Sequence, residues 1–170
     1  MNPRLLSNNL LLPYLVSTME DYFKSTFISL LRYSKKKDSF LKNVRLSSNH
    51  LVKISNGDLT VEEAVTENLP FQRISAISQH FRTIDPKIDI AGILRKPYRR
   101  RKKKLFDEID EFVEKRHAFI HWGEMDTQFS DKSLKKLMKD LETSIIRCYK
   151  FITSHYGWGF DQGWYRGKSA

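Results

Sequence analysis

Apolar residues recur along most of the chain at spacings of three and four, which is the period of an α-helix with one buried face. Near the start, this pattern predicts a long helix from Asn9 to Tyr33, with apolar positions at Leu12, Leu15, Val16, Met19, Tyr22, Phe23, Phe27, Leu30 and Leu31. The width of this stripe indicates that the helix is the central and most buried one. Lys35 to Lys37 favour an end at this point, because cations suit a helix C-terminus.

Shorter helices are predicted in the middle of the chain. One is indicated around Phe40–Leu46, before a turn at Asn56-Gly57. The segment Thr60–Glu63 matches a capping box, in which the Thr hydroxyl and the Glu carboxylate each accept a free backbone N–H, so a helix begins there. Leu69-Pro70 bends or interrupts it, and an amphipathic run over Phe71–Ile84 follows.

The second half of the chain predicts one more short helix and two long ones. Ile88–Leu94 favours the short helix, and a long one begins at Leu105 and ends near Trp122, where Gly123 is the natural stop. Its predicted core side chains are Phe106, Ile109, Phe112, Val113 and Ile120. The last helix begins after Ser130 or Asp131, and its apolar face comprises Leu134, Leu137, Met138, Leu141, Ile145, Cys148, Tyr149 and Ile152.

These elements predict an all-α fold, a bundle of about five helices in a single domain over residues 1–156. At 170 residues the chain has the size of one domain. Residues 157–170 form a Gly- and aromatic-rich tail for which two interpretations are open, docking on the body or stacking on nucleic-acid bases. The single cysteine excludes an intramolecular disulfide and a cysteine-rich zinc site, and it suits a reducing, cytoplasmic environment.

No segment predicts insertion into a membrane. The apolar stretch Leu10 to Val16 contains Pro13 and soon meets Glu20 and Asp21, whereas a membrane span needs about 20 largely apolar residues. The expectation is therefore a protein that neither crosses nor enters a membrane.

Positive charge is concentrated in one short segment. The formal net charge is +10, and Arg95 to Lys104 contains eight cations and no acid. Six of these, Arg99, Arg100, Arg101, Lys102, Lys103 and Lys104, come immediately before the helix that begins at Leu105. Cations at a helix N-terminus oppose its dipole, so local stability does not explain them. A solvated loop and a segment that binds phosphates, either of nucleic acid or of a membrane surface, are both open interpretations, and a polyanionic ligand accounts better for the position of these cations.

A second feature is the pair His117 and His121, four residues apart. This spacing puts both imidazoles on one helical face, roughly 5 to 6 Å apart at Cβ. One interpretation is half of a zinc site, but Ala118 stands where a zinc-protease helix has Glu, and no third ligand is evident nearby. Arg116 and His121 give another interpretation, since imidazole moves protons near neutral pH and guanidinium binds phosphate.

Helical geometry does not let Arg116 and His121 share one face. Their spacing of five residues rotates them about 140° apart around the axis. Arg116 should therefore lean over the edge of the core while His121 lies in the last turn. A site that uses both requires a distorted helix end, a groove or a second copy of the helix.

The segment Arg116-His117-Ala118-Phe119-Ile120-His121, followed by Gly123 and Asp126, resembles the signature of HEPN domains, the higher-eukaryote and prokaryote nucleotide-binding family. That signature is an Arg, a polar residue, three further residues and a His, late in the penultimate long helix. The resemblance covers about residues 8 to 156 and includes the long first helix and the final amphipathic helix.

The resemblance implies a HEPN-like helical bundle that forms a homodimer in which two motif helices face each other. Such proteins are often metal-independent endoribonucleases that need no cofactor and act as toxins or in defence against phage, some with an antitoxin partner. On this resemblance Arg116 and His121 are the expected catalytic residues, with His117 as an orienting third residue or as an exposed bystander. The cations Arg99 to Lys104 would hold RNA by its backbone.

Two further hypotheses remain open at this point. One is a non-catalytic RNA- or nucleotide-binding module, for which the basic segment and the aromatic tail are sufficient. The other is a helical interaction protein whose function is dimerisation or the binding of a partner protein.

Overall fold

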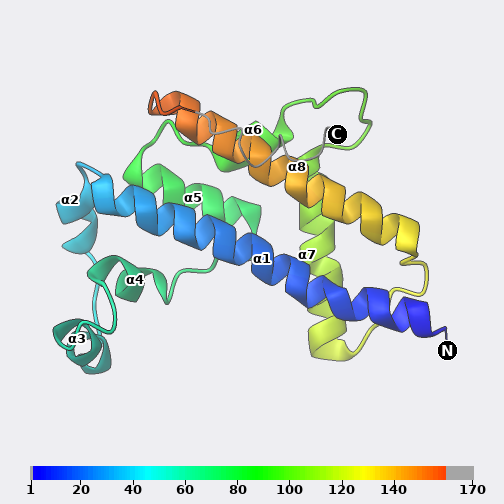
Figure 1. The fold of residues 1–170 in the computed structure, drawn as a ribbon, viewed down its shortest axis with the longest axis horizontal. Coiled ribbons are helices and arrows are strands. Elements are labelled where there is room, and N and C mark those ends of the chain that lie inside the picture. Colours follow the sequence, from blue (N-terminus) through cyan, green and yellow to red (C-terminus); the bar gives the residue numbers. More distant parts are fainter. Residues whose placement is uncertain (1, 160–170) are drawn as a thin grey trace, which may run out of the picture.

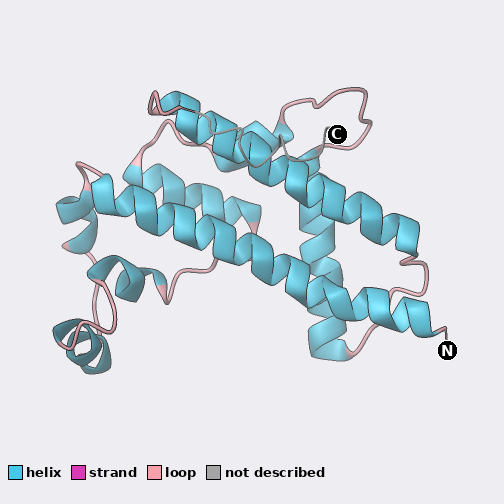
Figure 2. Cartoon of the chain, in the orientation of Figure 1, coloured by secondary structure: helices cyan, strands magenta, loops and turns pink. Residues whose placement is uncertain are grey.

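A computed structural model describes residues 2–159 of the chain, and these residues are helical with no strand among them (Figure 2). The bounds of the eight helices are α1 (Pro3–Tyr33), α2 (Lys37–Leu41), α3 (Ser48–Ser55), α4 (Val61–Thr66), α5 (Ile74–Ile84), α6 (Ile90–Arg95), α7 (Leu105–Trp122) and α8 (Asp131–His155). The all-α prediction is confirmed for this part of the chain. The expected number of about five helices is too low, because the segment between α1 and α7 divides into five short helices.

The three long helices form the framework of the fold. In Figure 1, α1 and α8 run beside each other and α7 crosses near the N-terminal half of α1. The first and last helices pack beside the helix that bears the histidines, since all three contact one another. The shorter α5 and α6 fill the remaining side, α5 against α1 and α6 against α8.

The local sequence explains where most helices begin and end. Thr60 caps α4, and the Glu63 carboxylate accepts a hydrogen bond from the Thr60 N–H, as the capping box predicts. Ser130 caps α8. The long first helix begins six residues earlier than expected, because the Asn2 side chain accepts from Arg4 N and Pro3 occupies the first turn.

One predicted helix is wrong. Residues 40–46 do not form a helix of their own, because α2 ends at Leu41 and the chain then turns into α3. The start of α3 is fixed by Ser47, whose hydroxyl accepts a hydrogen bond from the His50 N–H. In turn, Nδ1 of the His50 ring accepts a hydrogen bond from the Ser47 N–H. This cap is not predictable from the usual capping-box pattern, because His50 stands at the position where that pattern has Glu or Gln.

The core follows the predicted apolar stripe of α1. Its fully covered members Leu12, Val16, Met19, Phe23, Phe27 and Leu31 pack against the apolar faces of α5 to α8. Burial of this surface is the dominant stabilising contribution. Cys148 belongs to the same core, and its burial raises the pKa of the thiol to about 12, which makes it a packing residue rather than a nucleophile.

Three side chains assigned to the core face lie at the surface instead. Ile120, Met138 and Tyr149 have exposed fractions of 48%, 50% and 37%. Ile120 is exposed because the last turn of α7 extends past α1, as Figure 1 shows. Periodicity identifies the apolar face of a helix but not the length over which neighbouring helices cover it.

The far end of α8 is attached to the end of α5 by a polar contact. His155 Nε2 donates to Asp85 Oδ2 over 2.8 Å. Burial disfavours the charge on Asp85, but hydrogen bonding, first of all from His155, outweighs this and lowers the pKa of the carboxyl. The ionised form of Asp85 therefore stabilises this junction.

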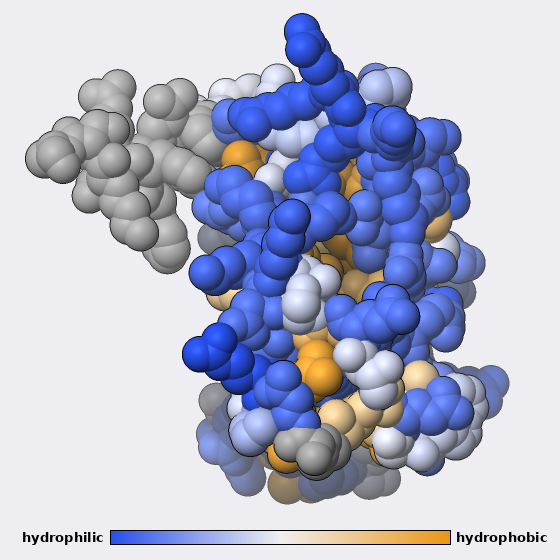
Figure 3. All heavy atoms as spheres, turned by 90° about the vertical axis from the view of Figure 1, so that its right-hand side faces the viewer, coloured by the Kyte–Doolittle hydropathy of each residue, from blue (hydrophilic) through white to orange (hydrophobic). Residues whose placement is uncertain are grey.

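The described surface is mostly hydrophilic on the side where α1 and α8 begin, with apolar side chains visible only in small areas (Figure 3). Among residues 2–159, no helix combines the length and apolar composition that crossing a bilayer requires. The tail predicted over 157–170 lies almost wholly outside the described residues.

Candidate functional site

The helix that carries Arg116, His117 and His121 is α7, and its bounds agree with the predicted ones. Gly123 ends it in the left-handed conformation with φ +67°. The Gly123 N–H donates to Phe119 O and the Glu124 N–H to Ala118 O, which satisfies carbonyls of the last turn. The end of this helix is therefore a defined turn rather than a frayed one.

The two histidines lie against each other at this end. The His117 and His121 ring centroids are 4.3 Å apart, and the Trp122 ring meets His117 edge-on at 5.3 Å. His117 is half-buried and His121 is exposed. The His121 imidazole can therefore exchange protons with solvent or with a bound substrate, while its neighbour restricts its rotation.

Arg116 points away from this pair and toward α1. Its Nε is buried and has no hydrogen-bond partner among residues 2–159, and the same holds for Glu20 Oε1 on α1. Burial raises the pKa of Glu20, the positive charge of Arg116 opposes that rise, and the negative charge of Asp21 adds to it. Arg116 thus lies near the Glu20 carboxylate, but the buried Nε of the one and the buried Oε1 of the other form no hydrogen bond in the described chain.

The structure therefore brings His117 and His121 together and leaves Arg116 on a different side of α7, as the helical angle predicted. No hydrogen bond or ion pair joins Arg116 to His121 within the described chain. Within a single copy of α7, the Arg116 guanidinium and the exposed His121 imidazole therefore cannot both contact the same phosphate group.

The segment after the motif is held to the start of α1 by two asparagines. Asn9 exchanges hydrogen bonds with the Asp126 backbone at 3.0 and 3.1 Å, and Asn8 Nδ2 donates to Phe129 O at 3.0 Å. Both asparagines are buried. Sequence reasoning missed these residues, although two polar residues flanking a predicted apolar stripe were a usable indication.

Asp126 also pairs with the motif helix through Lys115. Lys115 Nζ lies 2.9 Å from Asp126 Oδ2. Burial opposes the charge of Asp126, but the hydrogen bond and charge of Lys115 together with the hydrogen bond from the Gln128 N–H outweigh it, so the pKa of the carboxyl is lowered. The turn after α7 is therefore fixed by contacts from both α1 and α7, next to the histidines.

The basic segment divides into anchored and free cations. Arg101 forms an ion pair with the buried Asp140 of α8, and Lys103 pairs with Glu111 of α7. By contrast, five cations of this segment are exposed and form no ion pair in the described chain, namely Lys96, Arg99, Arg100, Lys102 and Lys104. The eighth, Arg95, is exposed and lies over the Phe106 ring. All six predicted RNA-binding residues thus lie in one loop, which we call the basic loop (residues 96–104), but only some are available to a ligand.

Tyr98 and Arg147 organise the basic loop. Arg147 of α8 donates to Lys96 O at 3.1 Å and to Pro97 O at 3.4 Å. The guanidinium carbons of Arg147, Arg99 and Arg101 lie 5.4, 5.3 and 5.9 Å from the centre of the Tyr98 ring. Such cation–π contacts favour one loop conformation. Sequence reasoning missed both residues, since their contact spans about fifty positions.

Asp140 is the deepest acid of this region, with 1% of its side chain exposed. Lys136 lies 3.0 Å from its Oδ2 and Arg101 pairs with its Oδ1. Burial opposes ionisation, but the pairing of Asp140 with Arg101 and Lys136 outweighs it and lowers the pKa of Asp140. The basic loop therefore supplies one of the two cations that compensate the charge of Asp140, and α8 itself supplies the other.

No group of three His, Cys, Asp or Glu side chains arranged to bind a metal ion occurs within residues 2–159. Comparison of the chain with family models, with curated proteins and with solved structures finds no match. The case for a function therefore rests on the geometry of α7 and of the basic loop.

Proposed function

We propose that this protein is a HEPN-type, metal-independent endoribonuclease whose catalytic residues are Arg116 and His121, with His117 as a positioning residue. The observation that carries the proposal is that one short stretch of α7 bears an exposed imidazole and, on another side of the helix, a guanidinium whose buried Nε has no acceptor among residues 2–159. Buried donors are almost always satisfied, so an unsatisfied one calls for an explanation. A phosphate oxygen is a suitable acceptor.

The proposed reaction is transesterification at a phosphodiester. The ribose 2′-oxygen attacks phosphorus and the bond from phosphorus to the 5′-oxygen breaks, which gives a 2′,3′-cyclic phosphate and a 5′-hydroxyl. His121 removes the 2′-hydroxyl proton or protonates the leaving 5′-oxygen. Arg116 stabilises the negative charge that develops on the phosphate.

The two groups meet on one phosphate if two copies of α7 face each other. We therefore propose a homodimer in which the arginine and the histidine of a site come together from the paired motif helices. Ile120 and Trp122, with exposed fractions of 48% and 65%, give this end of α7 the apolar surface that an interface needs. A monomer at micromolar concentration in light scattering, with full activity, would contradict this part of the proposal.

The exposed cations of the basic loop hold RNA by its phosphates. Phosphate contacts give affinity without much sequence choice, and they release counterions. Neutral replacements of Arg99, Arg100, Lys102 and Lys104 should raise KM and flatten its salt dependence with little change in kcat. Arg101 and Lys103 are left intact in this variant because they pair with Asp140 and Glu111. A salt dependence equal to that of the wild-type chain would contradict RNA contact by the loop.

The proposal is tested by cleavage of labelled RNA with the purified chain and its variants. His121→Ala should lose about 10² to 10⁴ in rate and Arg116→Ala about 10² to 10³. Because Arg116→Ala leaves the Glu20 charge uncompensated, its folding is checked beside the double variant Arg116→Ala with Glu20→Gln. A folded double variant with wild-type activity would refute the role of Arg116.

The biological role that we propose is that of a toxin or defence effector, with an antitoxin protein as a possible further partner. Growth arrest on expression, relieved by His121→Ala, is the expected result. The alternative is a non-catalytic RNA-binding module, which the free cations of the basic loop favour. Salt-dependent RNA binding without cleavage, unchanged by His121→Ala, would support that alternative.

A further inference from the structure

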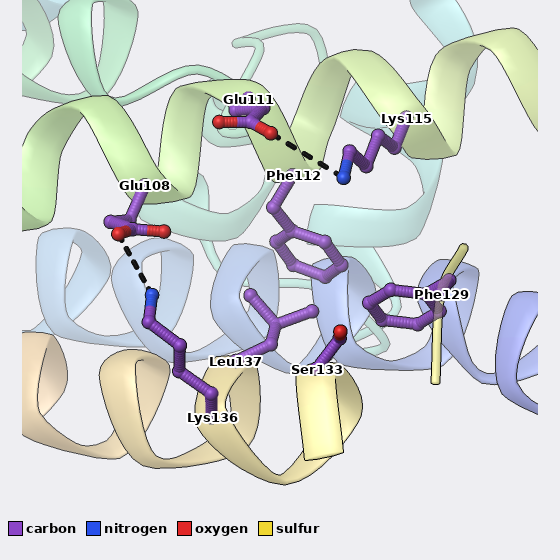
Figure 4. Close-up of a pocket in the computed structure, with 8 residues that line it drawn as sticks. All are labelled: Glu108, Glu111, Phe112, Lys115, Phe129, Ser133, Lys136 and Leu137. Carbon is purple, nitrogen blue, oxygen red and sulfur yellow. Dashed lines mark ion pairs between the residues drawn. The ribbon is translucent and has the colours of Figure 1, made fainter. Parts of the chain in front are cut away.

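A pocket of about 190 Å³ opens between α7 and α8 (Figure 4). The residues that line it are Glu108, Glu111, Phe112, Lys115, Phe129, Ser133, Lys136 and Leu137. Drug-sized ligands occupy pockets of roughly 300 to 1,000 Å³, so this one has room for a single small ring system.

The pocket has an apolar middle and a charged rim. In Figure 4 the apolar side chains are those of Phe112 from α7, Leu137 from α8 and Phe129 from the segment that precedes α8. An ion pair stands at one end, Lys136 Nζ to Glu108 Oε1 at 2.7 Å, and a second along α7, Lys115 Nζ to Glu111 Oε1 at 3.4 Å.

Each rim cation is neutralised by more than one acid. Besides its partner in the rim, Lys115 pairs with Asp126 at 2.9 Å and Lys136 pairs with Asp140 at 3.0 Å. The rim therefore gives no net attraction for a phosphate. It suits an uncharged ligand with apolar faces and an edge that carries both hydrogen-bond donors and acceptors, since the carboxylates accept and the ammonium groups donate. A nucleobase has this combination.

Ion pairs connect the rim of the pocket to the basic loop. Lys103 of the loop pairs with Glu111 in the rim, and Arg101 of the loop shares Asp140 with the rim residue Lys136. Along the axis of α7, Glu108 and Glu111 follow Lys104 by about 6 and 10 Å. A strand whose phosphates contact the loop thus has its next bases within reach of the pocket.

We propose that this pocket receives one unpaired base of an RNA whose phosphates lie on the free cations of the basic loop. The inference rests on the proposed function only in taking RNA as the ligand. A base inside a duplex is stacked and paired and does not enter the pocket. The pocket therefore selects single-stranded RNA.

The test replaces Ser133, a half-buried residue of the pocket wall in the first turn of α8, with tryptophan. Ser133→Trp fills the pocket, and Ser133→Ala is the matched control that leaves it open. Binding is measured by fluorescence anisotropy, at one fixed salt concentration, with labelled single-stranded oligonucleotides of A, C or U and with a duplex.

Wild-type protein and Ser133→Ala should bind the preferred single strand more tightly than the duplex. Ser133→Trp should lose about 5-fold to 100-fold in affinity for the single strand and keep its duplex affinity. Helical content checks that the Trp variant folds, and Ser133→Leu is the smaller replacement if it does not. Equal binding of single strand and duplex by the wild-type chain overturns the proposal, and so does unchanged single-strand affinity in the filled variants.

The outcomes separate this inference from the proposed function. If the wild-type chain cleaves RNA but filling the pocket does not change its affinity for single strands, only the pocket inference is refuted. If single strands bind as predicted but no RNA is cleaved, the ribonuclease proposal is refuted and the pocket inference is supported. Failure of the wild-type chain to bind any RNA contradicts both.

Discussion

Replacing Arg101 by alanine should destabilise the protein, although Arg101 stands in the middle of a run of surface cations. Its guanidinium is one of two cations that compensate the Asp140 carboxylate, of whose side chain 1% is exposed. Arg100→Ala, one residue away, removes a side chain that is exposed and forms no ion pair in the described chain. The two variants are therefore a matched pair with the same chemistry and opposite expectations.

The size of the effect follows from what remains around Asp140. Breaking a fully buried ion pair costs about 3 to 5 kcal/mol. Here Lys136 still pairs with Asp140 at 3.0 Å and Arg101 itself is 27% exposed, so we expect a loss of about 1 to 3 kcal/mol in the free energy of unfolding. For a chain of this size that loss lowers Tm by about 3 to 10 °C.

Thermal and urea unfolding followed by circular dichroism measure this difference. Arg100→Ala should stay within about 0.5 kcal/mol of the wild-type chain. The same variant should reduce the slope of RNA affinity against salt by about 0.7, the value for one phosphate contact with a single strand. Wild-type stability in Arg101→Ala, or an equal loss in both variants, would refute the division of the basic loop into anchors and free cations.

Three further predictions concern the motif helix and the junction at α8. His117→Ala should lower cleavage less than His121→Ala, because His117 orients its neighbour; kinetics on one RNA compare them, and an equal loss would make His117 catalytic. Gly123→Ala and Gly57→Ala both force alanine into positive φ, +67° and +78°, and each should cost about 1 kcal/mol in stability; only the first should change activity. Stability should fall below about pH 4, because the unfolded chain then takes up a proton that a folded carboxylate of depressed pKa such as Asp85 does not. Asp85→Asn should weaken that pH dependence, and acid titrations that coincide would contradict the argument.

The long helices could be predicted from the sequence because their information is local. Apolar spacing and the stop at Gly123 determine the bounds of α7, and the angle between Arg116 and His121 follows from helical geometry alone. The structure confirms that Arg116 turns toward the core side of α7 while His121 is exposed.

The environment of the site could not be predicted, because it depends on residues distant in sequence. Glu20 meets Arg116 only through the packing of α1 on α7, and Asp140 meets Arg101 only through the position of α8. In the sequence each is one acid among many on a helical face. The helix α3 was missed for a related reason, since a helix of eight residues has too few positions to show a clear period.

The central claim, that α7 carries a ribonuclease site that needs no metal, is tested most directly by one measurement. Purified chain is incubated with RNA in the presence of EDTA, beside the His121→Ala variant, and the ends of the products are identified. The account predicts cleavage with 2′,3′-cyclic phosphate and 5′-hydroxyl ends by the wild-type chain, and a rate about 10² to 10⁴ lower for the variant. Cleavage abolished by EDTA and restored by zinc would contradict it, and would make His117 and His121 part of a metal site instead.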